Sequence, residues 1–162
     1  MLNLDGLLIQ PPENRDRGLY GYIQVFRTGA IEAVQYGGAL LSEGRDFIPS
    51  TSATSFYRDA ILSFIALAKR FSIAGPVIVG CSLLHVGTYE LAVGNYYNSF
   101  NRAFADRAHL ILPEAWLSDA GEASNADSSI KPLMDILWQA FNVERCLEYT
   151  ESGEWAPPKG NR

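Results

Sequence analysis

A β-hairpin is encoded between Tyr20 and Tyr36, in the sequence Tyr-Gly-Tyr-Ile-Gln-Val-Phe-Arg-Thr-Gly-Ala-Ile-Glu-Ala-Val-Gln-Tyr. Two strand-like runs, at about residues 20–27 and 30–36, flank a short polar turn. A type I turn over Arg27-Thr28, with Gly29 in the left-handed bulge position, sets the register of the two strands. The hairpin therefore predicts an antiparallel sheet with a packed face.

The predicted register pairs Phe26 with Ala30 and Val25 with Ile31. A plain two-residue turn would instead mix Glu32 into the apolar face, so the hydrophobic pattern favours the bulged turn. The side chains expected to share the apolar face are Ile23, Val25, Ile31 and Ala33.

Length and composition indicate one folded domain. The chain has 162 residues, of which 48% are hydrophobic, and it lacks the composition of a disordered protein. We expect a single globular domain over residues 1–155 and a flexible tail over 156–162. The net charge is −5 and the 13 Lys and Arg residues are scattered, so we expect no strong nucleic-acid binding by this chain alone.

The sequence predicts a cytoplasmic protein that does not cross a membrane. The amino terminus has no basic region and carries Asp5, unlike a signal peptide, and no apolar run approaches ~18 residues. The two cysteines, Cys81 and Cys146, form no C-x-x-C motif. Cys81 lies in an apolar run and is expected to be a small buried hydrophobe.

The order of elements predicts an α+β fold, with a mainly antiparallel sheet and two amphipathic helices packed on it. Adjacent strands followed by a single helix do not give the regular alternation of a parallel sheet. A polar loop is expected at Ser118–Ser129. The expected strands are 4–9, the hairpin, 45–48, 77–84 (buried on both faces), 89–93, 109–112 and 145–149, and the expected helices are 55–72 and 130–142.

Helix capping and periodicity locate the predicted core. The sequence predicts Thr54 or Ser55 as the N-cap of the first helix, and Ser128 or Ser129 as the N-cap of the second. Apolar residues recur at helical spacing in both segments. The predicted core consists of Ile23, Val25, Ile31, Ala33, Ile61, Phe64, Ile65, Ala68, Val77, Val79, Leu83, Leu133, Leu137 and Phe141.

Catalytic and metal-binding motifs are absent from the sequence. His85 and His109 are more simply interpreted as exposed residues at strand ends, although a carboxylate such as Glu90 could orient one of them. No C-x-x-C, H-E-x-x-H, Gly-x-Ser-x-Gly or phosphate-loop pattern occurs, so no cofactor, metal or catalytic residue is predicted. The acids considered for paired carboxylates are Asp5, Asp46, Asp59, Glu90, Glu114 and Asp135.

The segment from Gly94 to Arg102 is rich in aromatic and Asn side chains. Tyr, Phe and Arg are typical of interface cores, and Asn residues could form a polar rim. The alternative is a loop whose rings cover the protein's own core. The predicted contact surface, for a second copy of the chain, an adjoining domain or another protein, consists of Tyr96, Tyr97, Phe100 and Arg102.

Several stretches together resemble one known family. They are Asn3-Leu-Asp-Gly-Leu-Leu8, Tyr22–Val34, Phe56-Tyr-Arg-Asp59, Pro76–Leu84, Leu112-Pro-Glu114, Asp135–Ala140 and the ending Tyr149…Gly153-Glu-Trp155. The chain is similar to the C-terminal region of bacterial proteins whose N-terminal half is a Schlafen-AlbA-type DNA-binding domain. The resemblance implies a fragment, or a standalone relative, of a regulatory or defence protein. It transfers neither nuclease nor DNA-binding activity to these residues.

Two functions remain open at this point. The first is a non-catalytic accessory module for ligand sensing, oligomerisation or partner docking. The second is a hydrolase or nuclease that uses Asp or Glu with His85 or His109. Side chains of those types gathered in one pocket would favour the enzyme, whereas an exposed apolar or aromatic patch would favour the module.

Overall fold

The computed structural model describes residues 1–11, 21–36, 40–42, 45–93, 104–117 and 126–157. The described chain forms the predicted α+β fold, with two helices and small, mostly antiparallel sheets. The chain forms two compact units, Met1–Gly38 and Ala39–Arg162. The single domain predicted over 1–155 stays a prediction. The elements are β1 (Gly6–Ile9), β2 (Gly21–Phe26), β3 (Ile31–Gln35), β4 (Leu40–Ser42), β5 (Arg45–Pro49), α1 (Ser50–Arg70), β6 (Val77–Val79), β7 (Ser82–Leu84), β8 (Glu90–Ala92), β9 (His109–Ile111), β10 (Ala115–Leu117) and α2 (Ala126–Gln139).

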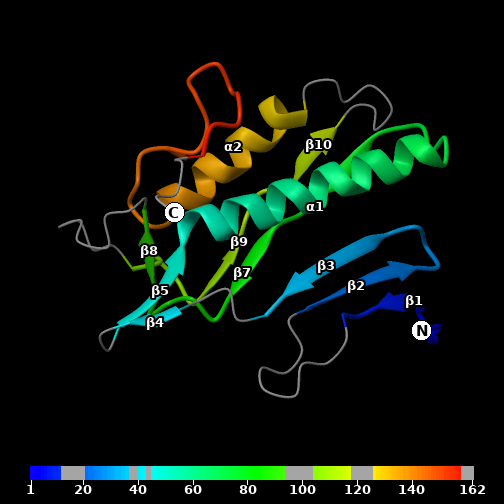
Figure 1. Cartoon of the computed structure of the whole chain (residues 1–162), viewed down its shortest axis with the longest axis horizontal. Helices are drawn as coiled ribbons and strands as arrows, with labels where there is room; N and C mark the ends of the chain where they lie inside the picture. The colour runs from blue at the N-terminus through cyan, green and yellow to red at the C-terminus, as the bar shows by residue number, and fades with distance from the viewer. Residues whose placement is uncertain (12–20, 37–39, 43–44, 94–103, 118–125, 158–162) are drawn as a thin grey trace. The chain divides into compact units, whose positions relative to one another are not determined.

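The first unit contains the antiparallel sheet β1-β2-β3, drawn in blue in Figure 1. Its hairpin confirms the predicted register, because Val25 pairs with Ile31. The Phe26 amide donates to the Ala30 carbonyl at 2.8 Å. Gly29 has a φ of 88°, a conformation that glycine adopts without a steric penalty, so the bulged turn is confirmed as well.

The apolar face of this sheet is less buried than predicted. Ile23 lies opposite Ala33, and both share a face with Val25 and Ile31. Ile23 is nevertheless 38% exposed and the other three are half-buried, so their assignment to the core was wrong. The described residues of this unit supply a single layer of sheet, and one layer alone cannot enclose its own apolar face.

Helix α1 begins earlier than the sequence indicated. It follows Pro49, the N-cap residue, with Ser50 as its first residue, so the cap predicted at Thr54 or Ser55 was wrong. Proline has a fixed φ and can precede a helix without a capping side chain. Thr54 therefore lies in the second turn and is fully buried.

Both helices end in the same hydrogen-bonded motif. After α1, the Ile73 amide donates to the Ala68 carbonyl at 2.9 Å, and Ser72 has a φ of 52°. After α2, the Val143 amide donates to the Trp138 carbonyl at 3.1 Å and Asn142 has a φ of 57°. This is the Schellman arrangement, in which the left-handed residue is usually glycine.

The strand predicted over residues 77–84 is two strands in two different sheets. β6 pairs with β10 and β7 pairs with β9, in both cases antiparallel. Gly80 and Cys81 separate them. Both short strands alternate between exposed and half-buried residues, so the prediction of one strand buried on both faces was wrong.

The remaining sheet contains a parallel pair. β4 and β5 are antiparallel, whereas β5 and β8 are parallel. α2 begins at Ala126, so residues 126–129 of the predicted loop are helical and the cap predicted at Ser128 or Ser129 was wrong. Residues 118–125 lie outside the described part of the chain. Pro132 is the seventh of the 14 residues of α2, so it lies in the helix interior and not in the first turn, and it donates no backbone hydrogen bond there.

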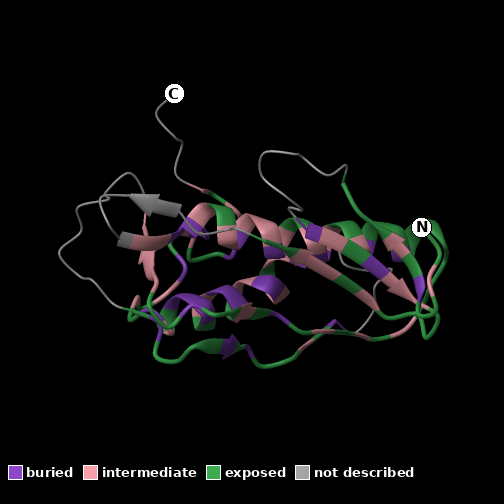
Figure 2. Ribbon diagram, turned by 90° about the horizontal axis from the view of Figure 1, so that it is seen from below, coloured by how far each residue is buried: buried purple, intermediate pink, exposed green. Residues whose placement is uncertain are grey.

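The second unit has one hydrophobic core between its helices and strands. Figure 2 shows buried segments on both helices among exposed ones. Val77, Val79 and Leu83 pack against this core half-buried, and Phe64 is half-buried. The predicted core residues confirmed as buried are Ile61, Ile65, Ala68, Leu133, Leu137 and Phe141.

The buried core also contains residues beyond the predicted list, among them Cys81, whose predicted burial is confirmed. Met134 and Trp138 of α2 are at most 1% exposed. Cys81 and Cys146 are buried and not joined in a disulfide, and burial raises the pKa of each thiol to about 11. Within the described chain, neither helix is both long and apolar enough to cross a membrane.

Candidate functional site

The face of the first sheet opposite the apolar one carries a different set of side chains. Gln24 lies opposite Leu8 on one side and opposite Glu32 on the other. Side chains alternate along a strand, so Tyr22 and Phe26 project on the same face as Gln24. This face therefore presents aromatic, amide and carboxylate groups from β2 and β3 and the aliphatic side chain of Leu8 from β1.

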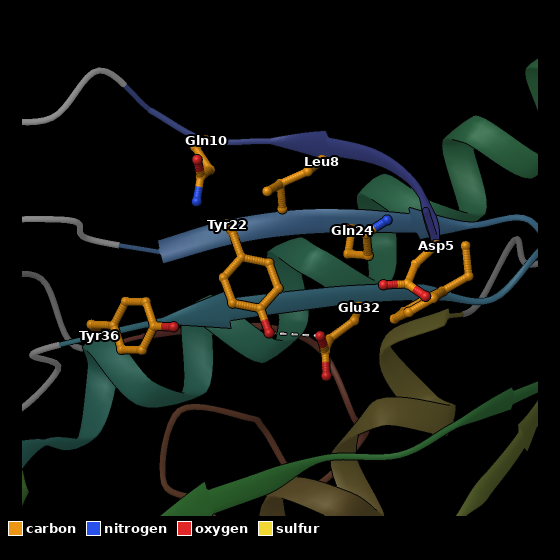
Figure 3. A pocket seen from close by; sticks show the side chains of 8 residues that line it. Asp5, Leu8, Gln10, Tyr22, Gln24, Glu32 and Tyr36 are labelled. Carbon is orange, nitrogen blue, oxygen red and sulfur yellow. Dashed lines mark hydrogen bonds between the residues drawn. The ribbon is translucent and has the colours of Figure 1, made fainter. Parts of the chain in front are cut away.

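These side chains line a groove, which we call the Tyr–Glu groove (Figure 3). Its volume is about 320 Å³, near the lower end of the range for small-molecule sites. Asp5 and Glu32 are the charged residues in the described lining. The complete described lining consists of Asp5, Leu8, Gln10, Tyr22, Gln24, Phe26, Glu32 and Tyr36.

A hydrogen bond crosses the groove wall from β2 to β3. The Tyr22 hydroxyl donates to Glu32 Oε2 at 2.7 Å. This bond to the carboxylate, with burial and the nearby negative charge adding to it, raises the pKa of Tyr22 to about 12. Tyr22 therefore stays a neutral donor at physiological pH. Within the described residues, the Glu32 carboxylate accepts this one bond and is otherwise open to solvent or to a ligand.

Two tyrosine rings stand next to this bond. The ring centroids of Tyr22 and Tyr36 lie 6.3 Å apart with a 48° angle between the planes. Tyr36 is 50% exposed, and it follows the last residue of β3. Figure 3 shows the Tyr22 ring between Tyr36 and the Glu32 carboxylate.

Gln24 forms a fixed part of the groove. Its side chain is 5% exposed, and its Oε1 accepts a hydrogen bond from Asn3 Nδ2 at 2.9 Å. Asn3 Oδ1 in turn accepts from the Gly6 amide at 2.8 Å. Because the amide groups of Asn3 and Gln24 hold one another, the groove has a preorganised polar floor.

The structure brings the two histidines together. Their ring centroids lie 4.7 Å apart at an interplanar angle of 84°, and both residues are exposed. The His85 amide donates to His109 Nδ1 at 3.1 Å. In the described part of the chain, neither ring has a hydrogen bond to a carboxylate, Glu90 included, and no group of three metal-binding side chains occurs.

A buried polar cluster was missed by sequence reasoning. Glu148 is 1% exposed, and its Oε1 accepts from Ser50 Oγ at 3.1 Å. Its Oε2 has no hydrogen-bond partner among the described residues. Burial, opposed by hydroxyl groups of the first turns of α1, raises the pKa of Glu148. The run of Ser and Thr at residues 50–55 was the available signal, but it was interpreted as helix capping.

Other charged groups near this cluster join the helices to the C-terminal segment. Arg58 of α1 donates two hydrogen bonds to Asp127 of α2, at 2.6 and 2.9 Å. The Arg58 guanidinium also lies 5.0 Å from the ring centroid of Trp155. Tyr149 contacts Asp127 and Trp155, because its hydroxyl donates to Asp127 and its ring packs against Trp155. These contacts are internal, so their role is structural.

A second depression, of about 310 Å³, lies in the second unit between β9 and α2. Its charged lining residues are Asp106 and Arg107, which pair with each other at 2.9 Å. Its charges are therefore satisfied within the protein, in contrast to those of the Tyr–Glu groove.

The contact surface predicted from the sequence lies outside the described residues. This applies to all four of its members, Tyr96, Tyr97, Phe100 and Arg102. The Tyr–Glu groove was not predicted as a site. Its signal was the alternation of Tyr22, Gln24 and Phe26 on the face that the apolar residues leave free.

Comparison with known proteins gives no further assignment. No protein-family model matches the chain, and neither a curated protein nor a solved structure matches it.

Proposed function

We propose that this chain is a non-catalytic accessory module of a cytoplasmic bacterial regulatory or defence protein. Its task is to sense a ligand or to dock a protein partner, an adjoining domain or a second copy of itself. The observation that carries the proposal is the Tyr–Glu groove, where side chains from three strands converge on a preorganised floor. A site built on strands holds its groups in fixed positions, as selective binding requires.

The histidine pair offers less support for an enzyme. A hydrolytic mechanism needs a general base held by an orienting group. In the described residues, His109 Nδ1 is occupied by a backbone amide, and neither histidine ring has a hydrogen bond to a carboxylate.

The proposal is tested by nuclear magnetic resonance on the ¹⁵N-labelled chain. Three tetrapeptides that differ only in one central residue, Lys, Gln or Glu, are titrated to millimolar concentration. At least one is expected to shift the amide signals of β2 and β3 in a saturable way. If none shifts them, or if the shifts gather around His85 and His109, the groove is not the binding surface.

A matched variant separates binding from general charge effects. Glu32→Gln removes a charge inside the groove, and Glu151→Gln removes the same charge from a side chain that is 87% exposed in the second unit. Only the first is expected to change the affinity of a groove ligand. Equal effects of the two variants would contradict the proposal.

A further inference from the structure

The electrostatics of the Tyr–Glu groove select the charge of its ligand. Asp5 and Glu32 bring two negative charges, and no basic residue appears in the described lining. The Asp5 side chain has no hydrogen bond or ion pair within the described residues. Arg27, five residues before Glu32, donates from its Nε to the Leu4 carbonyl at 3.0 Å and is not part of the described lining. Within the described residues, no cation neutralises the negative charge of the groove.

Two of the hydrogen-bond donors in the lining, on Tyr22 and Gln24, are already engaged within the protein. The Tyr22 hydroxyl donates to Glu32, and Gln24 Nε2 donates to the Val25 carbonyl at 3.3 Å. The faces of aromatic rings carry partial negative charge, so the Tyr22 and Tyr36 rings also repel an anion and attract a cation. An ammonium or guanidinium group over the Tyr22 ring lies beside the Glu32 carboxylate, to which the Tyr22 hydroxyl donates at 2.7 Å, and the Tyr36 ring lies 6.3 Å from the Tyr22 ring in the same groove.

The apolar lining suits an alkyl stem. Leu8 and Phe26 border the same groove, and lysine and arginine bury their methylene chains on such surfaces while the charged end stays polar. A volume of about 320 Å³ accommodates a single side chain of this kind.

The position of the groove points to a peptide as the carrier of the cation. β3 is at the edge of its sheet, and no described strand pairs with its outer side. An extended segment that pairs with such an edge places alternate side chains over the face that carries Glu32. Tyr36, just beyond β3, is placed to contact the same side chain.

We propose that the Tyr–Glu groove binds a lysine or arginine side chain of an extended partner segment. The cation contacts the Tyr22 and Tyr36 rings and pairs with the Glu32 carboxylate. This inference rests on the proposed function and specifies the chemical class of its ligand.

The test uses the three tetrapeptides described above and butylammonium chloride, with the whole chain. The Lys peptide should bind at least about fivefold more tightly than the Gln peptide, the size expected when an exposed ion pair and a cation–π contact act together. The Glu peptide should bind most weakly. If the Gln or Glu peptide shifts the groove signals as strongly as the Lys peptide, the cation inference fails and the proposed function stands. If no probe shifts them, both fail.

Substitutions in the groove test which side chains bind the Lys peptide. Glu32→Gln and Tyr36→Leu should each weaken binding of the Lys peptide by about two- to fivefold, and Glu151→Gln should leave this binding unchanged. Tyr22→Phe keeps the ring and frees Glu32 from its internal donor, so binding should be retained or tightened. A loss of binding in Tyr22→Phe, with the amide spectrum otherwise preserved, would overturn the proposed role of Glu32. Equal affinities for butylammonium and the Lys peptide would overturn the inference that an extended partner segment carries the cation.

Discussion

The Glu148 carboxyl and the Ser50 hydroxyl meet inside the protein, where Ser50 Oγ donates to Glu148 Oε1 at 3.1 Å. Ser50 is the first residue of α1, so this bond ties the start of the helix to the C-terminal segment. Both residues are almost fully buried, at 2% and 1% exposure. An acidic group is favourable at a helix amino terminus, yet its charged form is costly away from water.

The burial of Glu148 predicts a specific pH dependence of stability. Its pKa is higher in the folded than in the unfolded state, so the folded protein binds the proton more tightly. The contribution of Glu148 to stability is therefore full below the unfolded-state pKa and is lost as pH rises through the folded-state pKa. Urea unfolding of the native chain and of Glu148→Gln across this range should show a smaller loss in the variant. The same pH slope in both would contradict the assignment, and Glu154→Gln, at an exposed position, is the charge-matched control.

The contact between Trp138 and Thr54 predicts the cost of an unpaired donor. Trp138 Nε1 donates to Thr54 Oγ1 at 3.1 Å, and both side chains are buried. Thr54→Val keeps the shape but leaves the indole N–H without an acceptor, which should reduce the free energy of unfolding by about 1–3 kcal/mol. Thr54→Ser keeps the acceptor and serves as the control. If the two variants unfold at the same urea concentration, the bond does not contribute.

Substitutions of two neighbouring residues of α1, Phe64 and Ile65, should differ in how much stability they cost, although the sequence assigned both residues to the core. Ile65 is 6% exposed, whereas Phe64 is half-buried. Ile65→Ala should cost about 2–5 kcal/mol, and Phe64→Ala less than the ~3–5 kcal/mol of an enclosed ring. Denaturant unfolding of both variants measures which one loses more free energy of unfolding. A larger loss for Phe64→Ala would show that the buried face of α1 is rotated from the one described.

The left-handed residue after α1 predicts a stabilising substitution. Ser72 has a φ of 52°, which costs a residue with a Cβ roughly 1–2 kcal/mol, while glycine adds roughly 0.5–1 kcal/mol of unfolded-state entropy. Ser72→Gly should therefore raise the free energy of unfolding by about 0.5–1 kcal/mol, the difference between these terms. Thermal unfolding provides the measurement, and Ser72→Ala should give no gain. A destabilised Ser72→Gly would show that the Ser72 side chain makes a contribution of its own.

Local patterns predicted the hairpin well because its register depends on nearby residues. The position of Gly29 and the apolar alternation on both sides of it determine which residues pair. The start of α1 was misplaced because Ser and Thr residues can cap a helix or lie inside it. The choice depended on Glu148, which lies 98 residues from Ser50 in the sequence. No local pattern contains that contact.

The same limit applies to the candidate site. The sequence indicated that Glu32 lies off the apolar face, but the groove also needs β1, because Leu8 faces Gln24 across the sheet. The hydrogen bond from Tyr22 to Glu32 depends on this assembled register. Residues 77–84 were predicted as one strand because their apolar run was interpreted without its pairing partners. The run contains two strands, and these belong to different sheets.

The burial of both native thiols offers a practical route to observing the groove at work. Cys81 and Cys146 are 7% and 0% exposed, and a thiol with a pKa of about 11 is almost entirely protonated at neutral pH. Maleimide reagents attack thiolates, so they should spare both residues in the folded chain. A cysteine introduced at the exposed Gln10, in the lining of the Tyr–Glu groove, would then be the single position to receive a fluorophore. The chain can thus carry a site-specific optical reporter without first being stripped of its own cysteines.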